Sequence, residues 1–216
     1  MKEDSLKKKP LKSKIKQAWK DFWYLLWKDD SLKGWIFALI IIFIFIKLIF
    51  FPLLSFSTGT SLPLAIVESC SMYHRGNLLS NFDEWWELHN KNYFSYGITQ
   101  EQFSDFIFTR GVNKGDVLFI VGVSPKDVRI GDVIIYNTVS NPRPIIHRVI
   151  SIKGVKDNLI FSTMGDEVGY VQFFEKEIPQ DAIVGKAVFK IVPYAGWLKL
   201  IFFELKKSKT ERGFCN

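Results

Sequence analysis

The chain is poor in the side chains that most often hold a fold or a metal ion in place. Its 216 residues include only two cysteines, Cys70 and Cys215, and three histidines. The cysteines lie far apart in the sequence, and none of these residues follows the short spacing that zinc sites use. We therefore expect no stabilising disulfide, no metal site and no cofactor.

Acidic residues are outnumbered by basic ones, and the excess is concentrated at one end. The formal net charge is +7, from 29 basic and 22 acidic residues. Residues 1–34 hold ten lysines and five acids, which gives +5, and the rest of the chain holds 19 basic and 17 acidic residues, which gives +2. A basic lead before a hydrophobic span is typical of a cytoplasmic anchor attracted to anionic lipid headgroups. A nucleic-acid-binding tail is the alternative, but no recognisable nucleic-acid module follows it.

Long hydrophobic runs are scarce as well, and the sequence contains one, at residues 34–54. About 20 apolar residues cross a bilayer, and the single charge in the run, Lys47, lies toward its far end, where it can snorkel. A cleaved signal peptide is the competing interpretation. The 33-residue charged lead is too long for one, and no small-x-small cleavage site follows the run. The positive-inside rule then predicts residues 1–33 in the cytoplasm and residues 55–216 outside.

The basic lead contains its own periodic segment between Trp19 and Trp27. Its aromatic and leucine side chains recur at helical spacing with lysines at the edges. Such a pattern predicts an amphipathic helix in the membrane interface. An ordinary core helix is the alternative.

Beyond the span the hydrophobic period changes to that of strands. Short runs rich in Val, Ile and Phe alternate with Gly-Asp, Asn-Pro and Lys-Asp-Asn turn signals, which predicts a mainly β domain. The expected strands are residues 62–67, 116–122, 132–137, 144–152, 159–163 and 183–192.

An aromatic insertion, residues 73–113, interrupts this β pattern. Asn81 with Glu84, and Thr99 with Gln102, each have the three-residue spacing of a capping box, so we expect two short helices. The insertion could form a small satellite core or a surface that meets a membrane or a partner, since large aromatic patches mark such sites.

The candidate chemistry lies in a short segment that follows the span. Ser69 and Ser71 are two residues apart, so in an extended strand both hydroxyls point to the same face. A serine hydroxyl needs a neighbouring base to become a nucleophile. His147 lies in an expected strand where alternation sends it and Arg148 to opposite faces, and His74 is a second choice for the base.

Several motifs, taken together and in order, resemble type I signal peptidases. They also resemble the archaeal and endoplasmic-reticulum branch of that family, in which a histidine replaces the catalytic lysine. The motifs are Ser-Cys-Ser-Met at 69–72, Lys-Gly-Asp-Val at 114–117, Ile-Gly-Asp-Val-Ile at 130–134, Ile-Ile-His-Arg-Val at 145–149, Gly-Asp at 165–166, Val-Gly-Lys-Ala-Val at 184–188 and Val-Pro-Tyr-Ala-Gly-Trp at 192–197.

The resemblance implies a membrane-bound endopeptidase that removes signal peptides after small residues. It matches Ser71 with the nucleophile, His147 with the general base and Asp166 with an active-site carboxylate. We also expect the Ser69 hydroxyl to help bind the oxyanion. The sequence departs from the family where Cys70 replaces a glycine and Gln172 stands at the position of a second acid.

Because that second acid is missing, the sequence leaves open which carboxylate orients His147. Asp166 is the primary candidate, and Glu167, Glu175 and Asp181 are alternatives. The fold expectation is a signal-peptidase-like β domain outside the membrane, with an N-terminal transmembrane helix and a short helical aromatic insertion.

The expected partners are signal-peptide-bearing preproteins and the lipid bilayer, with the protein translocation channel as a further candidate. The expected location is the cell membrane, or the endoplasmic reticulum membrane in a eukaryote. The rival hypothesis is a noncatalytic membrane-tethered β module that binds translocon components or exported chains.

Overall fold

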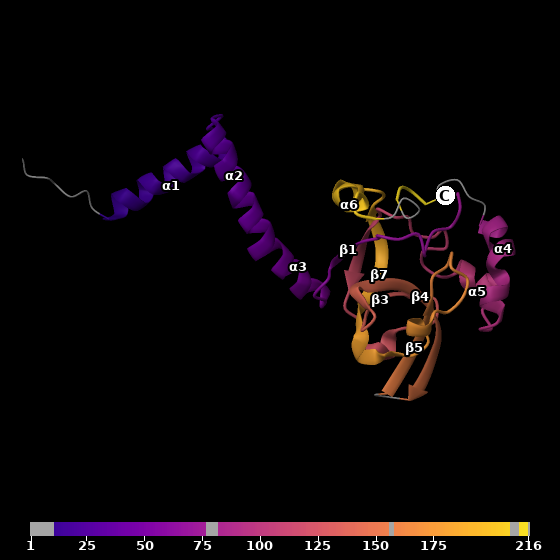
Figure 1. Ribbon diagram of the computed structural model, residues 1–216. Coiled ribbons are helices and arrows are strands. Elements are labelled where there is room, and N and C mark those ends of the chain that lie inside the picture. Colours follow the sequence, from indigo (N-terminus) through magenta and orange to yellow (C-terminus); the bar gives the residue numbers. More distant parts are fainter. Residues whose placement is uncertain (1–10, 77–81, 156–157, 208–211, 216) are drawn as a thin grey trace, which may run out of the picture. The chain divides into compact units, whose positions relative to one another are not determined.

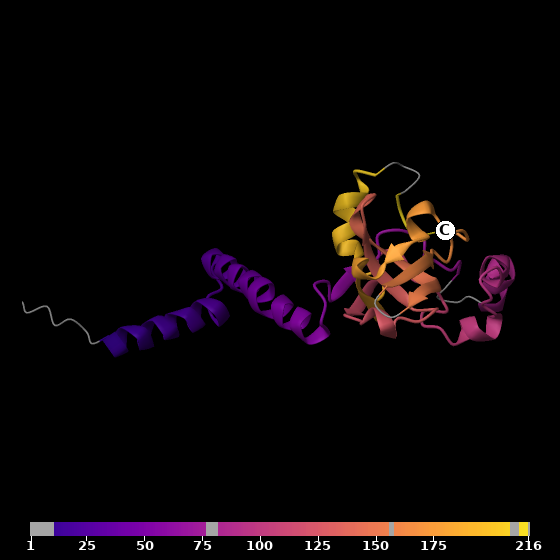
Figure 2. The same ribbon diagram turned by 90° about the horizontal axis from the view of Figure 1, so that it is seen from below.

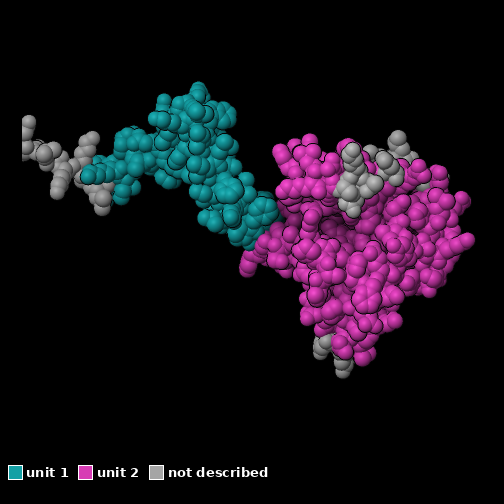
Figure 3. Space-filling view, viewed as in Figure 1, with its two compact units in different colours: residues 1–54 teal, residues 55–216 magenta. Residues whose placement is uncertain are grey.

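The computed structural model describes residues 11–76, 82–155, 158–207 and 212–215 of the chain. It divides into two compact units, Met1–Leu54 and Ser55–Asn216, which Figure 3 colours separately. Figure 1 labels the helices and most of the strands.

The first unit is helical. Helix α1 covers Leu11–Trp27 and α2 covers Leu32–Phe45, where the Ser31 hydroxyl caps α2 by accepting from the Gly34 N–H at 3.2 Å. The widened turn η1, Ile46–Phe50, joins α2 to α3, Phe51–Thr58. It ends two residues before Pro52, whose missing N–H disturbs the regular hydrogen-bond pattern of a helix.

Together these segments form a continuous helix, Leu32–Thr58, of 27 residues. Within the described residues it is the one helix long and apolar enough to cross a membrane. The structure therefore contains the expected N-terminal apolar helix, with bounds slightly wider than residues 34–54. Helix α1 includes the segment expected to be helical, Trp19 to Trp27, but begins eight residues earlier, at Leu11. Its placement in the membrane interface stays a prediction.

The second unit is built on one antiparallel sheet in the order β1-β2-β7-β3-β4-β5-β6 (Figure 1). This confirms the mainly β expectation, although the sequence analysis missed the two-residue β6. The strands are β1 Leu64–Ile66, β2 Val117–Val121, β3 Val133–Thr138, β4 Asn141–Val155, β5 Asn158–Met164, β6 Ile178–Pro179 and β7 Ile183–Val192. Short 3-10 turns lie at η2 Pro125–Asp127, η3 Phe173–Glu175 and η4 Gln180–Ala182.

The central strand β3 is buried on both faces. Val133 and Ile135 pack in one apolar cluster with Leu118 and Ala187, whereas Ile134 packs in another with Val149 and Phe161. Since successive strand residues point to opposite faces, β3 contributes to both clusters at once. This buried strand pairs with β7 along one edge and with β4 along the other, and β4 carries His147.

The insertion forms a small satellite core, one of the two structures that the sequence analysis left open for it. Helix α4, Phe82–Phe94, and helix α5, Gln100–Ser104, pack Trp85, Tyr93 and Phe103 against Ile150 of β4 and Met164 of β5. In Figures 1 and 2 these magenta helices lie on one side of the sheet and the yellow helix α6, Trp197–Glu204, lies on the other.

The Thr99–Gln102 capping box forms as predicted, with the Thr99 N–H donating to Gln102 Oε1 at 2.9 Å and the Gln102 N–H donating to Thr99 Oγ1 at 3.3 Å. Asn81, the other expected cap, lies outside the described residues.

The C-terminal segment returns to the loop after β1, which carries the two serines. Cys215 forms a disulfide with Cys70, 145 residues away, so the expectation of no disulfide was wrong. The Phe214 ring packs on Trp197 with centroids 4.5 Å apart, and the Gly213 N–H donates to Glu204 at 3.0 Å. These contacts with α6, a helix that the sequence analysis did not predict, bring Cys215 back to the sheet.

Candidate active site

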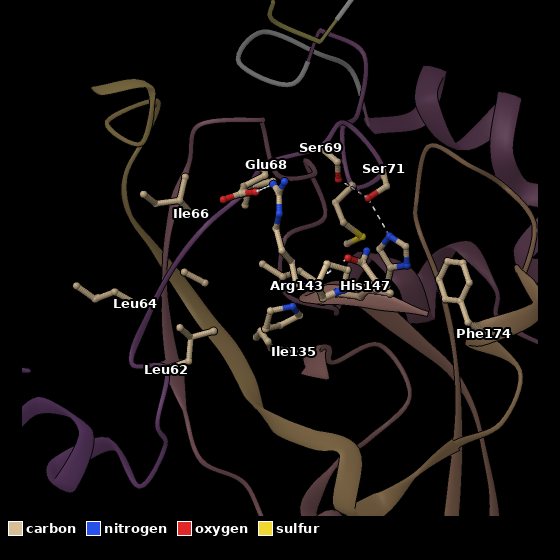
Figure 4. A pocket seen from close by; sticks show the side chains of 18 of the residues that line it. Leu62, Leu64, Ile66, Glu68, Ser69, Ser71, Ile135, Arg143, His147 and Phe174 are labelled. Carbon is tan, nitrogen blue, oxygen red and sulfur yellow. Dashed lines mark hydrogen bonds and ion pairs between the residues drawn. The ribbon is translucent and has the colours of Figure 1, made fainter. Parts of the chain in front are cut away.

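Ser71 and His147 meet at hydrogen-bond distance, as the sequence predicted. Ser71 lies in the loop after β1 and His147 lies in β4, and the Ser71 Oγ is 2.8 Å from His147 Nε2 (Figure 4). The Glu167 N–H donates to the Ser71 carbonyl at 2.9 Å, and the neighbouring Met72 side chain is buried in the core. The loop that carries the hydroxyl is therefore held at Ser71 itself and at the residue that follows it.

Glu175 is the carboxylate that contacts the other nitrogen of the imidazole. Its Oε1 bonds His147 Nδ1, and the Glu175 side chain is fully buried. With the Nδ1–H donating to the carboxylate, Nε2 is left to accept the Ser71 proton. The Gln172 N–H donates to the second Glu175 oxygen at 2.7 Å, so both oxygens are held.

The expectation that Asp166 orients His147 is not met. The hydrogen bonds of the Asp166 carboxylate go to His74 Nε2 at 2.8 Å, to the Tyr93 hydroxyl at 2.8 Å and to Arg148 Nη2 at 2.7 Å. Asp166 follows β5 into a turn that points its side chain toward the insertion, and Glu175, one of the alternatives, takes the position beside His147.

A local signal for Glu175 was present in the sequence. Gln172 and Glu175 have the three-residue spacing of a capping box, and this box forms at η3. Gln172 is not the Ser or Thr with which such a box usually begins, so the three-residue spacing is a weaker signal here than at Thr99 and Gln102.

The Asp166 cluster is buried and ionic. Burial alone would raise the pKa of the Asp166 carboxyl, but the Arg148 charge and the hydrogen bonds from His74 and Arg148 outweigh burial and hold that pKa well below its usual range. Burial lowers the pKa of His74, against the opposing effect of Asp166. The His74 ring also stacks on Trp85 with centroids 3.6 Å apart. His74 thus links the insertion to the sheet through Asp166 and Trp85.

Strand alternation correctly separated the two neighbours His147 and Arg148. His147 faces Ser71, while Arg148 is fully buried and donates to Asp166 and to the carbonyls of Ile107 and Gly131. Ser69 Oγ lies 3.1 Å from Ser71 Oγ, so the two hydroxyls lie side by side as predicted, although both residues lie in the loop after β1 and not in a strand.

A groove of about 840 Å³ runs along these residues (Figure 4). One wall is the segment from Leu62 to Ser71, which includes the edge strand β1, and the other is the first half of β4. In the described chain β5 pairs with β4 only from Arg148 onward, so residues 141–147 have one unpaired edge facing the groove. Leu64, Ile66 and Ile145 give the walls an apolar character.

Comparison with known proteins gives a partial match. No protein-family model matches the chain. The human and dog proteins named signal peptidase complex catalytic subunit SEC11C are each 28% identical to it over 104 residues, which are 45% of this chain and 53% of theirs. The match thus spans about half the length of these curated relatives. This distant similarity supports, at the level of the family, a relation to type I signal peptidases.

Proposed function

We propose that this chain is a membrane-anchored serine endopeptidase that cleaves signal peptides, with Ser71 as nucleophile and His147 as general base. The observation that carries the proposal is the connected series Ser71 Oγ, His147 and Glu175. A hydroxyl, an imidazole and a buried carboxylate in this order are the parts that an acyl-transfer mechanism requires.

In the proposed reaction His147 Nε2 removes the proton of Ser71 as the oxygen attacks the scissile carbonyl. The resulting imidazolium gives that proton to the leaving amine, which departs and leaves an acyl-enzyme. Water then attacks the ester carbonyl while the same imidazole takes a proton from that water. The imidazolium passes this proton to the Ser71 oxygen as the bond between the acyl carbon and that oxygen breaks. Glu175 is a positioning residue here, because it keeps the Nδ1 proton in place and stabilises the positive ring without touching the substrate.

The oxyanion formed in each step needs hydrogen-bond donors. The Ser71 N–H and the Ser69 hydroxyl are the candidates, since Ser69 Oγ lies 3.1 Å from the attacking oxygen. Removing one such donor costs about 3 to 4 kcal/mol of transition-state stabilisation in comparable enzymes.

An extended peptide is the substrate shape that the groove favours. The groove lies between two strand segments, β1 and residues 141–147 of β4, and a peptide can add to such an edge as a further strand. The resemblance to signal peptidases implies small side chains on the substrate next to the cleaved bond.

The apolar helix Leu32–Thr58 would anchor the enzyme, with the basic lead in the cytoplasm. Disulfides persist in oxidising compartments, so the Cys70–Cys215 disulfide supports an extracytoplasmic location for residues 55–216. Preproteins carrying signal peptides are the proposed substrates, and association with the translocation channel is a further proposal.

Cleavage of a purified signal-peptide-bearing precursor by the full chain in detergent or lipid tests this function. Ser71→Ala and His147→Ala should lower the rate by at least about 10²- to 10⁴-fold. His89→Ala is the matched control, because His89 lies on α4 and bonds the Trp85 carbonyl at 2.8 Å. Equal cleavage by wild type and Ser71→Ala would reject the protease and leave the noncatalytic β module.

A further inference from the structure

A cluster of charged side chains connects the two walls of the groove. Glu68 lies on the segment leading to Ser71, Arg143 lies on β4, and Lys199 lies on α6; all three line the groove. Arg143 Nη1 bonds one Glu68 oxygen, and Lys199 Nζ is 3.2 Å from the other. Figure 4 shows Glu68 and Arg143 meeting between the walls.

Positive charge exceeds negative charge in this part of the groove. Among the described lining residues there are three cations of Lys or Arg type, Arg143, Lys199 and Lys207, and one carboxylate, Glu68. Lys207 pairs with Glu204 at 2.9 Å, a carboxylate outside the groove lining that also pairs with Lys114 at 2.7 Å. Arg143 and Lys199 therefore share the single carboxylate of Glu68.

The two cations remain accessible to another anion. The Arg143 side chain is 62% exposed and the Lys199 side chain 51% exposed, compared with 26% for Glu68. Ion pairs that are so open to water are weak. A guanidinium can also bind a carboxylate through two parallel N–H donors. An incoming peptide could offer such a carboxylate at the same place.

We infer that Arg143 and Lys199 form an anion subsite of the groove that binds an Asp or Glu side chain of the substrate peptide. Glu68 occupies this subsite when no peptide is bound. The inference rests on the proposed function, because it places an extended peptide in the groove. Alternate residues of an extended strand face the same wall, so an acidic side chain reaches the cations from one substrate position or from two positions two residues apart.

A peptide series tests this specificity. In a neutral peptide that contains one cleavage site, a single Asp is moved along the sequence, and Asn at the same position is the uncharged control. We expect kcat/KM to rise about threefold to fivefold for Asp over Asn at the responsive position, as a partly exposed ion pair gives. Added salt should reduce the ratio, since mobile ions screen such pairs.

Three variants should change the Asp/Asn ratio of kcat/KM, two of them downward and one upward. Arg143→Gln and Lys199→Gln should lower the Asp/Asn ratio toward one, whereas Glu68→Gln should raise it, because the competing carboxylate is removed. Lys153→Gln is the matched control: Lys153 is an exposed cation on the same strand, β4, outside the groove lining. Its ratio should equal that of the wild type.

Binding to the Ser71→Ala variant separates this inference from the proposed function. The affinities of the Asp and Asn peptides for that variant report the subsite without any cleavage. A ratio of one at every position in both assays, or a preference for Asp that survives Arg143→Gln, would overturn the anion subsite. A preference in binding without cleavage by the wild type would keep the subsite and reject the peptidase.

Discussion

Replacing Cys215 by serine should destabilise the domain far more than it slows catalysis. The disulfide joins residues 145 apart, and the chain-entropy relation for a loop of that length gives a loss of about 5 kcal/mol in the free energy of unfolding. Ordinary domains have only about 5 to 15 kcal/mol in total. For a domain of this size the loss corresponds to a fall in Tm of about 10 to 20 °C.

The rate should respond less, because other contacts hold Ser71. Its carbonyl accepts from the Glu167 N–H at 2.9 Å, and Met72 next to it is only 1% exposed. At temperatures where the variant is still folded, kcat should therefore stay within about tenfold of wild type, which is about 1.4 kcal/mol of activation free energy.

Thermal unfolding of the full chain, followed by circular dichroism with and without reductant, measures the effect. The Tm of the reduced wild type should equal that of Cys215→Ser, and reductant should not change the Tm of Cys215→Ser. An unchanged Tm in Cys215→Ser would refute the loop-entropy argument. A loss of kcat far beyond tenfold in the folded variant would refute the claim that Glu167 and Met72 suffice to hold the nucleophile.

Four further predictions follow from the contacts around the site. Glu175→Gln should lower kcat about 10²- to 10⁴-fold with little change in Tm. Asp166→Asn should instead lower the free energy of unfolding by about 3 to 5 kcal/mol, because it leaves buried Arg148 without its charged partner. The reverse pattern, in rates and Tm values measured on both variants, would return the orienting role to Asp166. The pKa of His74 is lowered from its usual 6.5 in the folded chain. Below pH 6.5 the unfolded chain therefore binds a proton at His74 more readily than the folded chain does, and the free energy of unfolding should fall as the pH drops below 6.5. In Tm measurements between about pH 7.5 and about pH 5, His74→Gln should make Tm fall less steeply with decreasing pH than in the wild type. An unchanged slope would argue against this role of His74. Gly165→Ala should abolish cleavage in a folded protein, since the added Cβ would lie 2.8 Å from the Ser71 carbonyl oxygen and 3.0 Å from His147 Nε2, and retained activity would contradict the tight packing. Protease added outside sealed cells should reach the domain after residue 54 and spare the N-terminal lead, and protection of the domain would reverse the orientation.

The parts of the fold that the sequence predicted depend on local periodicity. The strand expected at residues 183–192 forms as Ile183–Val192, and the one expected at 132–137 forms one residue later, as Val133–Thr138. Alternation along β4 also separated His147 from Arg148 correctly. These predictions succeed because a strand repeats every two residues and a buried face selects apolar side chains.

The parts that could not be predicted depend on segments distant in sequence that meet in space. The partner of Cys70 is fixed by the return of the C-terminal segment over α6, and a pair of cysteines 145 residues apart carries no local sign of this. The acid beside His147 is set by the path of the chain between β5 and β6. Asp166 and Glu175 both lie on that path and both are buried, and spacing alone does not say which one faces His147.

The backbone around Asp166 offers a physical reason why a Gly-Asp motif lies beside the site without touching His147. The next residue, Glu167, donates its N–H to the Ser71 carbonyl, while the Asp166 carboxylate is anchored on Arg148. A fully buried ion pair with several hydrogen bonds has few alternative arrangements, so it fixes the backbone on which it stands. The Asp166 side chain can therefore act on the nucleophile through its own main chain, while the imidazole takes its orientation from Glu175 on the following turn.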